Sequence, residues 1–199
     1  PRLHVAPDLG VGADIPIDGD QAHYLTRVLR LGVGDPVRVF NGRDGEFEAS
    51  VSAVTKSTAR LLLGDRMREQ ATVPDLWLLF APLKKARTDF LVEKAVELGA
   101  AELLPVITER TDAETVRVDR LSRIAIEAAE QTERLDVPLV REAVKLEPLL
   151  AKWGASRLLI YADEAGDEGG RPWGGDAGRA RPMAEVLSAM ADSPAAILI

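Results

Sequence analysis

The fold is decided by residues 76–112, LWLLFAPLKKARTDFLVEKAVELGAAELLPVITERTD. Its start, Leu76–Ala81, is a short apolar run of the kind found in strands that are buried on both faces. Thr88 is placed to cap a following helix, and Gly99 suits the position just past a helix end. Apolar residues between them recur at helical spacing: Leu91, Ala95 and Leu98. With a second apolar run at Leu103–Ile107, the stretch predicts a strand–helix–strand unit with parallel strands.

Charged residues gather where each of these two strands ends. The first loop carries Lys84, Lys85 and Arg87, and the second carries Glu109, Arg110 and Asp112. Open parallel sheets bind ligands at the carboxyl ends of their strands. We therefore expect a site in these loops, with a solvated charged rim as the alternative.

The composition excludes several classes of protein. Hydrophobic residues make up 46% of the 199 residues, enough for a substantial core. The lack of cysteine excludes disulfides, thiolate zinc sites and a cysteine nucleophile, and is compatible with the reducing cytoplasm where we expect the protein. No apolar run reaches the length of a membrane span, so we expect no membrane contact. A net charge of −7 argues against general adhesion to nucleic acid but does not exclude a local basic surface.

Two domains are predicted, over residues 1–72 and 73–199. The first contains short strand candidates separated by glycine turns, which favours a small β-barrel. The second alternates strands and helices, with a helix over 119–134, a buried strand over 157–162, a long loop over 163–181 and a last buried strand over 195–199.

One helical segment, residues 21–31, interrupts the strands of the first domain. It places His23, Arg27 and Arg30 along one side at spacings of four and three. Such a basic stripe on an acidic chain is typical of phosphate contact, although a solvated helix face gives the same pattern.

A second polar motif lies near the end of the helix predicted over 119–134. Gln131 and Arg134 are spaced as neighbours on a helix, and an amide beside a guanidinium can hold a base and a phosphate. A helix surface carrying ion pairs is the alternative.

Common catalytic motifs are absent from the sequence. There is no glycine-rich dinucleotide fingerprint, no phosphate-binding loop and no G-x-S-x-G turn. His4 and His23 are the only histidines, and the carboxylates do not cluster at ligand spacing, so we expect no metal.

Three stretches together resemble one family. They are HYLTRVLRLGVGDPVRVFNG at 23–42, LKKARTDFLVEKAVELGAAELLPVITERTD at 83–112 and EAAEQTERLDVP at 127–138. In order and spacing they are similar to the signatures of the bacterial 16S rRNA uridine-N3 methyltransferases, members of the SPOUT (trefoil-knot) group. The resemblance runs from about residue 20 to the end of the chain.

The resemblance implies a PUA-like β-barrel followed by an α/β SPOUT domain that ends in a trefoil knot. It also implies S-adenosylmethionine as methyl donor and a homodimer. The family's G-P-E-G-G loop and L-G-x-R-I-L-R segment, which are expected to hold the cofactor, do not occur in this sequence. We therefore expect residues 1–199 to have little affinity for the cofactor by themselves.

The implied reaction is methylation of N3 of a uridine in 16S rRNA of the small ribosomal subunit. Arg110 would stabilise the deprotonated uridine, and Glu109 would take the proton or orient Arg110. The residues expected to contact rRNA are His23, Arg27, Arg30, Lys84, Lys85, Gln131 and Arg134. The residues expected near the cofactor are Ala162, Asp163, Glu164, Leu198 and Ile199.

Two other functions fit the same residues. A non-catalytic rRNA-binding or ribosome-assembly factor would use the two domains without methyl transfer. An α/β enzyme for a small anionic metabolite would use Arg110 and Arg134 as an anion clamp.

Overall fold

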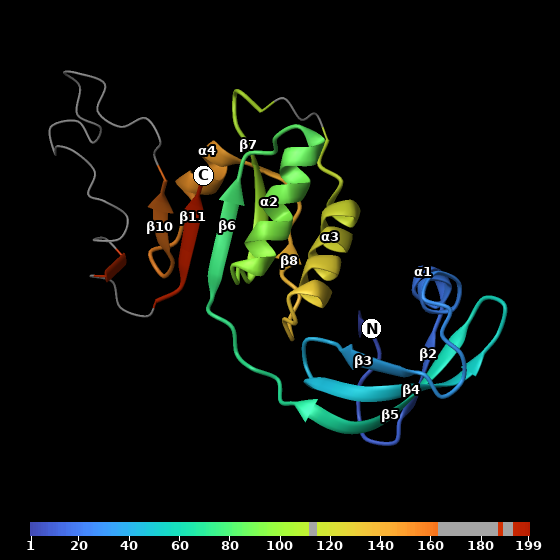
Figure 1. Cartoon of the computed structure of the whole chain (residues 1–199). Helices are drawn as coiled ribbons and strands as arrows, with labels where there is room; N and C mark the ends of the chain where they lie inside the picture. The colour runs from blue at the N-terminus through green and yellow to red at the C-terminus, as the bar shows by residue number, and fades with distance from the viewer. Residues whose placement is uncertain (112–114, 163–186, 189–192) are drawn as a thin grey trace, which may run out of the picture. The chain divides into compact units, whose positions relative to one another are not determined.

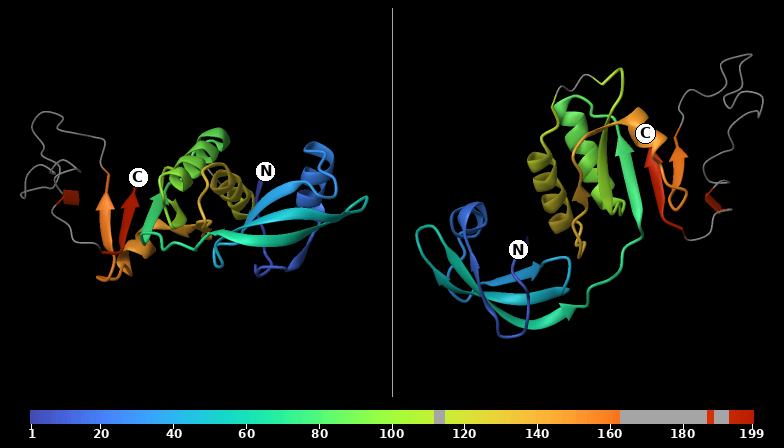
Figure 2. Two further views of the ribbon diagram at one scale, coloured as in Figure 1. Left: turned by 60° about the horizontal axis from the view of Figure 1, so that its bottom comes forward. Right: turned by 180° about the vertical axis from the view of Figure 1, so that it is seen from behind.

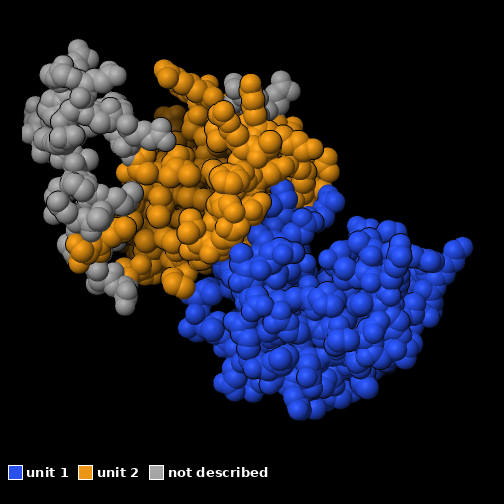
Figure 3. All heavy atoms as spheres, viewed as in Figure 1, with its two compact units in different colours: residues 1–73, 123–137 blue, residues 74–122, 138–199 orange. Residues whose placement is uncertain are grey.

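The structure, a computed structural model, describes residues 1–111, 115–162, 187–188 and 193–199. It divides into two compact units (Figure 3). The first comprises Pro1–Val73 with Arg123–Val137, and the second comprises Pro74–Ser122 with Pro138–Ile199. Residues 123–137 therefore associate with a part of the chain far from them in sequence, which no local pattern indicates.

The first unit is built on a five-stranded sheet (Figure 1). Its strands, in the spatial order β1–β3–β4–β5–β2, are β1 (Arg2–His4), β3 (Pro36–Phe40), β4 (Glu46–Val54), β5 (Ala59–Arg68) and β2 (Asp14–Ile17). β1 runs parallel to β3, and the other neighbours are antiparallel. Alternate residues of the strands enter one apolar core, in which Val39 and Leu61 are fully buried.

A helical turn between β2 and β3 departs from the regular helix expected over residues 21–31. α1 (Gly19–His23) is followed by a π-helical turn, η1 (Tyr24–Val28), in which the Leu29 N–H bonds to the Tyr24 carbonyl at 3.0 Å. Arg30 then adopts a left-handed conformation with φ of 57°. The wider turn keeps Leu25 fully buried while Leu29 and Leu31 still pack against the same core. Tertiary packing thus overrides the helical spacing seen in the sequence.

The second unit contains the predicted strand–helix–strand unit. β6 (Leu76–Phe80) and β7 (Glu102–Ile107) are parallel neighbours joined by α2 (Lys85–Glu97), which confirms that prediction. The sheet has the order β10–β11–β6–β7–β8, and each neighbouring pair is parallel. The remaining strands are β8 (Leu139–Val140), β10 (Leu158–Tyr161) and β11 (Ala195–Leu198), with β9 (Val144–Lys145) also paired to β7.

Helices cover both faces of this sheet. α4 (Leu146–Ala151) packs on the face that carries Leu79, Leu104 and Ala196, and α2 lies over the opposite face (Figure 2). α3 (Val118–Gln131) follows β7 and presents Leu121, Ala125 and Ala128 as a buried stripe, as the sequence predicts.

Several details of the second unit differ from the sequence-based expectations. Leu98 is 84% exposed, because it follows the last residue of α2, whose buried face is formed by Val92, Ala95 and Val96. Thr88 lies inside the helix instead of capping it, and its hydroxyl bonds to the backbone of Leu83. Of the strand expected to be buried over 157–162, only Ile160 is buried, because β10 is the edge strand of the sheet.

Candidate functional site

The carboxyl ends of four parallel strands, β6, β7, β10 and β11, lie at one edge of the sheet. There the Ala162 N–H bonds to the Leu198 carbonyl at 2.9 Å, and the Ile199 N–H bonds to the Leu79 carbonyl at 3.1 Å. Three of the residues predicted near a cofactor, Ala162, Leu198 and Ile199, are therefore brought side by side. The other two, Asp163 and Glu164, lie outside the described residues.

The turn after β7 carries Glu109 and Arg110. Two threonines fix its backbone: the Thr108 N–H donates to Oγ1 of Thr111 at 2.9 Å, and the Thr111 N–H donates to the Thr108 carbonyl at 3.2 Å. Both charged side chains are exposed, and neither forms an ion pair within the described part of the chain. The turn thus presents a carboxylate and a guanidinium to solvent. Asp112, the third charged residue predicted in this loop, lies outside the described residues.

A pocket of about 350 Å³ lies beside the first turns of α2 and α3 in the second unit. It is lined by Pro82, Leu83, Lys84, Lys85, Thr88, Thr115, Val116, Arg117, Arg120 and Leu121. The two lysines were predicted from the sequence as RNA contacts. Arg117 and Arg120, which line the same pocket, were not predicted as RNA contacts. Two basic residues at the start of a predicted helix could have indicated them.

The three basic residues predicted as one stripe lie in the first unit. His23 ends α1, Arg27 lies in η1, and Arg30 lies beyond the helical turn. All three are exposed, as phosphate contacts must be. The prediction that the three residues line one face of a regular helix is wrong, because the π-turn and the left-handed Arg30 interrupt the helix. Their contact with RNA stays a prediction.

The motif that contains Gln131 and Arg134 also has a different geometry from the one expected. α3 ends at Gln131, Glu133 takes a left-handed φ of 58°, and the Arg134 N–H bonds back to the Ala129 carbonyl at 3.1 Å. The Arg134 side chain is only 11% exposed and is paired with Asp136 through two of its nitrogens. Gln131 is exposed, so of the two it alone projects an uncovered polar group.

A buried arginine that the sequence analysis missed holds this motif in the first unit. Arg2 is paired with Glu46, and its Nη1 and Nη2 donate to the carbonyls of Ala129 and Arg134 at 2.8 and 2.5 Å. Its guanidinium also stacks 3.8 Å from the centre of the Phe40 ring. One side chain from β1 thus fixes the end of α3.

Beside Arg2, a carboxyl and an imidazole have shifted pKa values. Oε1 of Glu130 accepts a hydrogen bond from the His4 N–H at 2.8 Å. Burial raises the pKa of Glu130, and the His4 hydrogen bond and the Arg2 charge oppose that rise. Burial, with the nearby charges of Arg43 and Arg2, lowers the pKa of His4.

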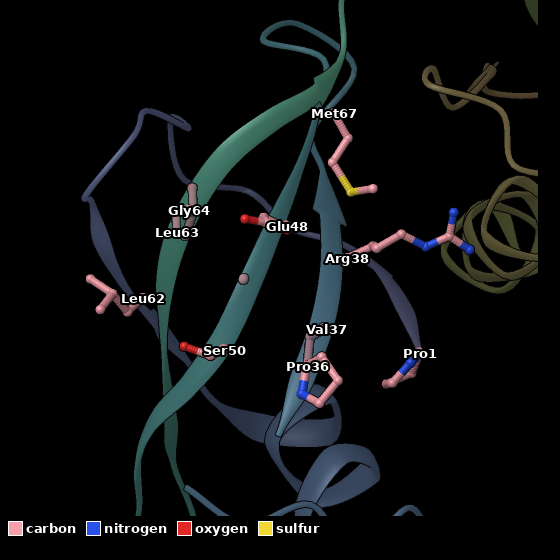
Figure 4. A pocket seen from close by; sticks show the side chains of 11 residues that line it. Pro1, Pro36, Val37, Arg38, Glu48, Ser50, Leu62, Leu63, Gly64 and Met67 are labelled. Atoms are coloured by element: carbon pink, nitrogen blue, oxygen red, sulfur yellow. The ribbon is translucent and has the colours of Figure 1, made fainter. Parts of the chain in front are cut away.

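A second pocket, of about 590 Å³, lies along β3, β4 and β5 in the first unit (Figure 4). Its charged lining residues are Arg38 and Glu48. Arg38 is already bound to Glu133 at 2.8 Å, so the pocket offers little free positive charge. Within the described ranges, no group of three or more His, Cys, Asp and Glu residues could hold a metal, and no helix is long and apolar enough to cross a membrane.

Comparison with family models identifies the chain. An RNA methyltransferase domain matches residues 69–176, and an RNA methyltransferase PUA domain matches residues 17–63. The chain belongs to the RNA methyltransferase domain family. The first match contains Glu109 and Arg110 together with the pocket beside α2 and α3, and the second contains the basic residues of α1 and η1.

Relatives of this RNA methyltransferase domain include two proteins named ribosomal RNA small subunit methyltransferase E. The one from Rickettsia conorii is 32% identical over 164 residues, which cover 82% of this chain and 66% of the relative. The one from Synechocystis is 37% identical over 142 residues, which cover 70% and 46%. The chain thus spans between about half and two thirds of the length of these curated relatives.

Solved structures confirm the predicted fold. The ribosomal RNA small subunit methyltransferase E from Neisseria gonorrhoeae, bound to S-adenosyl methionine, has a TM-score of 0.77 at 23% identity and covers 100% of this chain and 77% of its own. A probable rRNA-methyltransferase from Porphyromonas gingivalis has a TM-score of 0.73 at 26% identity, with coverage of 100% and 79%. The chain therefore has a PUA-like domain followed by an α/β SPOUT methyltransferase fold. The trefoil knot and the roles of the individual site residues stay predictions.

Proposed function

We propose that the protein is an S-adenosylmethionine-dependent methyltransferase that methylates N3 of a uridine in 16S rRNA of the small ribosomal subunit. The observation that carries this proposal is the RNA methyltransferase domain match over residues 69–176, a region shared with relatives named for small-subunit rRNA. We accordingly expect the reaction in the cytoplasm.

The end of β11 suits the cofactor. β11 lies between β10 and β6 with the same strand direction as both, and open α/β sheets bind ligands at the carboxyl ends of their strands. Ile199 is 50% exposed there and offers apolar surface to an adenine ring, beside Ala162 and Leu198. We assign these three residues to the cofactor site. When bound, S-adenosylmethionine supplies an electrophilic methyl group.

Arg110 and Glu109 would act on the uridine. N3 carries a proton that must leave before or while the methyl group arrives, and negative charge then develops on the ring oxygens. A guanidinium beside those oxygens stabilises that charge, and the Glu109 carboxylate can accept the proton. Their exposure on a turn that Thr108 and Thr111 hold rigid supports both assignments.

The RNA strand would be held by exposed polar groups of both units. We assign phosphate contact to His23, Arg27 and Arg30 in the first unit and to Lys84 and Lys85 in the second, because each of these side chains is exposed. Gln131 is available for a base or backbone contact. Arg134, being bound to Asp136, would position the segment that carries Gln131.

A second copy of the chain would complete the enzyme as a homodimer. α2 and the residue after it expose Phe90 and Leu98 at 61% and 84%, and large exposed apolar side chains on one helix favour contact with another molecule. Sedimentation equilibrium at several concentrations measures the state directly. A monomer at tens of micromolar would contradict this part of the proposal.

Methyl transfer tests the proposed reaction. Small subunits isolated from cells that lack the modification are incubated with the full-length protein and methyl-labelled S-adenosylmethionine, and the label is mapped in 16S rRNA. We expect label at N3 of one uridine, and none in subunits that already carry the methyl group. Tight binding to the subunit without transfer would favour a non-catalytic assembly factor, and binding of small phosphorylated metabolites in place of rRNA would favour a metabolic enzyme.

A further inference from the structure

Four basic side chains surround the pocket beside the first turns of α2 and α3. Lys84 and Lys85 come from the start of α2, and Arg117 and Arg120 come from the start of α3. Both helices begin after the carboxyl end of a sheet strand, β6 or β7, so the pocket lies on the substrate side of an open α/β sheet.

The charges of this pocket are only partly balanced. Arg117 is bound to Asp119 through Nε and Nη2 at 3.1 and 2.9 Å, and Arg120 is paired with Asp89. Lys84 and Lys85 form no ion pair within the described residues. Four cations against two carboxylates leave two positive charges around about 350 Å³ of open space.

Helix energetics do not explain the two lysines at the start of α2. The start of a helix carries a partial positive charge, so basic residues are unfavourable there and acidic ones are favoured. α2 nevertheless has no acidic residue in its first turn and no side-chain cap, and its N-cap is Lys84. Basic residues that destabilise the start of a helix indicate a functional role, because such departures from local stability rules are found mainly at functional sites.

We infer that this pocket binds one backbone phosphate of the rRNA substrate. A phosphodiester brings the negative charge that the pocket lacks, and a volume of about 350 Å³ accommodates it with its flanking sugar atoms. Asp119 occupies the Nε–Nη2 edge of Arg117, so its Nη1–Nη2 edge is the one that can donate to two phosphate oxygens, and the lysines act as mobile point charges. Arg120, held by Asp89, forms a fixed positive wall. The inference rests on the proposed function and adds the two arginines to the RNA-binding surface.

A double variant with a matched control tests the pocket. Lys85→Ala/Arg117→Ala removes one cation from each wall, and Lys145→Ala/Lys152→Ala removes two exposed cations of the same unit from either end of α4. The probe is a synthetic RNA with the sequence around the methylated uridine. We expect the pocket variant to bind this RNA more weakly and to lower the slope of log affinity against log salt by about 1, with a smaller change in the control. Equal effects of the two variants would overturn the inference.

Replacing one RNA phosphate by an uncharged methylphosphonate shows whether the pocket binds that phosphate. A set of probes carries one methylphosphonate each, moved along the strand. For the wild-type protein, one position should weaken binding more than its neighbours. In the pocket variant that position should lose its special effect, because the two changes remove the same contact. A sensitivity profile that is identical in both proteins would overturn the inference.

Inorganic phosphate separates RNA from small anions. If NMR detects phosphate binding at Lys85 while no methylphosphonate position is sensitive, the pocket serves a free anion and the inference is wrong. The proposed function fails in a different way, as wild-type protein that neither prefers the target RNA to a scrambled one nor methylates it. Wild-type methylation with no difference between pocket and control variants would contradict the phosphate pocket alone.

Discussion

Arg2 and Glu46 form an ion pair inside the first unit, where their side chains are 4% and 1% exposed. Arg38 and Arg68 lie 3.9 and 3.7 Å from the second carboxylate oxygen of Glu46, which accepts no hydrogen bond from the described residues. The other nitrogens of Arg2 bind the end of α3. The pair therefore ties β1, β4 and α3 together.

Loss of one partner of this pair should destabilise the first unit strongly. Arg2→Met leaves the Glu46 carboxylate buried without its closest cation, and such a change costs about 3–5 kcal/mol. Arg2→Met/Glu46→Leu should recover part of that loss, because it removes both buried charges. Hydrogen exchange of the amides of β4 reports the free energy of opening.

An exposed pair provides the control. Arg60 and Asp14 are bound at 2.6 Å with side chains 46% and 40% exposed, so Arg60→Met should cost less than about 1 kcal/mol. If Arg2→Met costs no more than Arg60→Met, the buried pair does not hold the unit together.

The pKa of His4 predicts a loss of stability in mild acid. Burial lowers this pKa below its usual 6.5, and Arg43 and Arg2 add to the effect. The unfolded chain then takes up the proton at a higher pH than the folded chain, so the free energy of unfolding falls as the pH drops from about 6.5 through the folded pKa. Unfolding in urea at pH 7.5 and pH 5 should show a smaller difference for His4→Gln. His23→Gln, an exposed control, should behave as wild type.

Glu130 acts in the opposite direction. Burial raises its pKa above 4.5, so the stability that it contributes is complete below pH 4.5 and is lost as the pH rises through the folded pKa. Glu130→Gln keeps an acceptor for the His4 N–H and removes the buried charge. We expect it to raise the free energy of unfolding at pH 7, whereas Glu130→Ala should lower it. A Gln variant that is less stable than wild type at pH 7 would mean that the Glu130 charge itself stabilises the folded state.

Local patterns were sufficient for part of the fold. The strand–helix–strand unit around α2 follows from apolar runs and helical spacing within fewer than forty residues, and the structure has the same elements. The buried stripe of α3 follows from the same periodicity. The same pattern placed Glu109 and Arg110 in an exposed turn, because the apolar run Leu103–Ile107 marks where the strand ends.

Long-range contacts were beyond such patterns. Arg2 meets Glu46 and, more than a hundred positions away, the end of α3, and no periodicity connects those positions. The π-turn that carries Arg27 arises because Leu25, Leu29 and Leu31 share one core, which is a tertiary constraint. A helix spacing rule therefore located the basic residues but gave the wrong geometry between them.

Arg30 allows stability and RNA binding to be separated. A non-glycine residue in the left-handed region costs roughly 1–2 kcal/mol, so Arg30→Gly should raise the free energy of unfolding by up to about 1 kcal/mol. Arg27→Gly lies in a helical turn and should lower it by a similar amount. Both variants lose one cation, and both should bind target RNA more weakly with a flatter salt dependence. If the salt dependence of RNA binding is unchanged in both variants, the two arginines belong to a solvated surface and do not contact RNA.

Arg110 should affect turnover more than affinity. An interaction that strengthens as negative charge develops on the uridine lowers the barrier to methyl transfer, so Arg110→Ala should reduce kcat by roughly 10² or more. Stability should stay near that of wild type, because the side chain is exposed and its turn is held by Thr108 and Thr111. Arg110→Lys should recover only part of kcat, since an ammonium lacks the planar fork. The measurement is the single-turnover rate of methyl transfer at a saturating concentration of small subunits. Lys152→Ala is the control for the loss of one positive charge. Normal kcat with weaker subunit binding would make Arg110 a positioning contact, and the stabilising charge would then have to come from another residue.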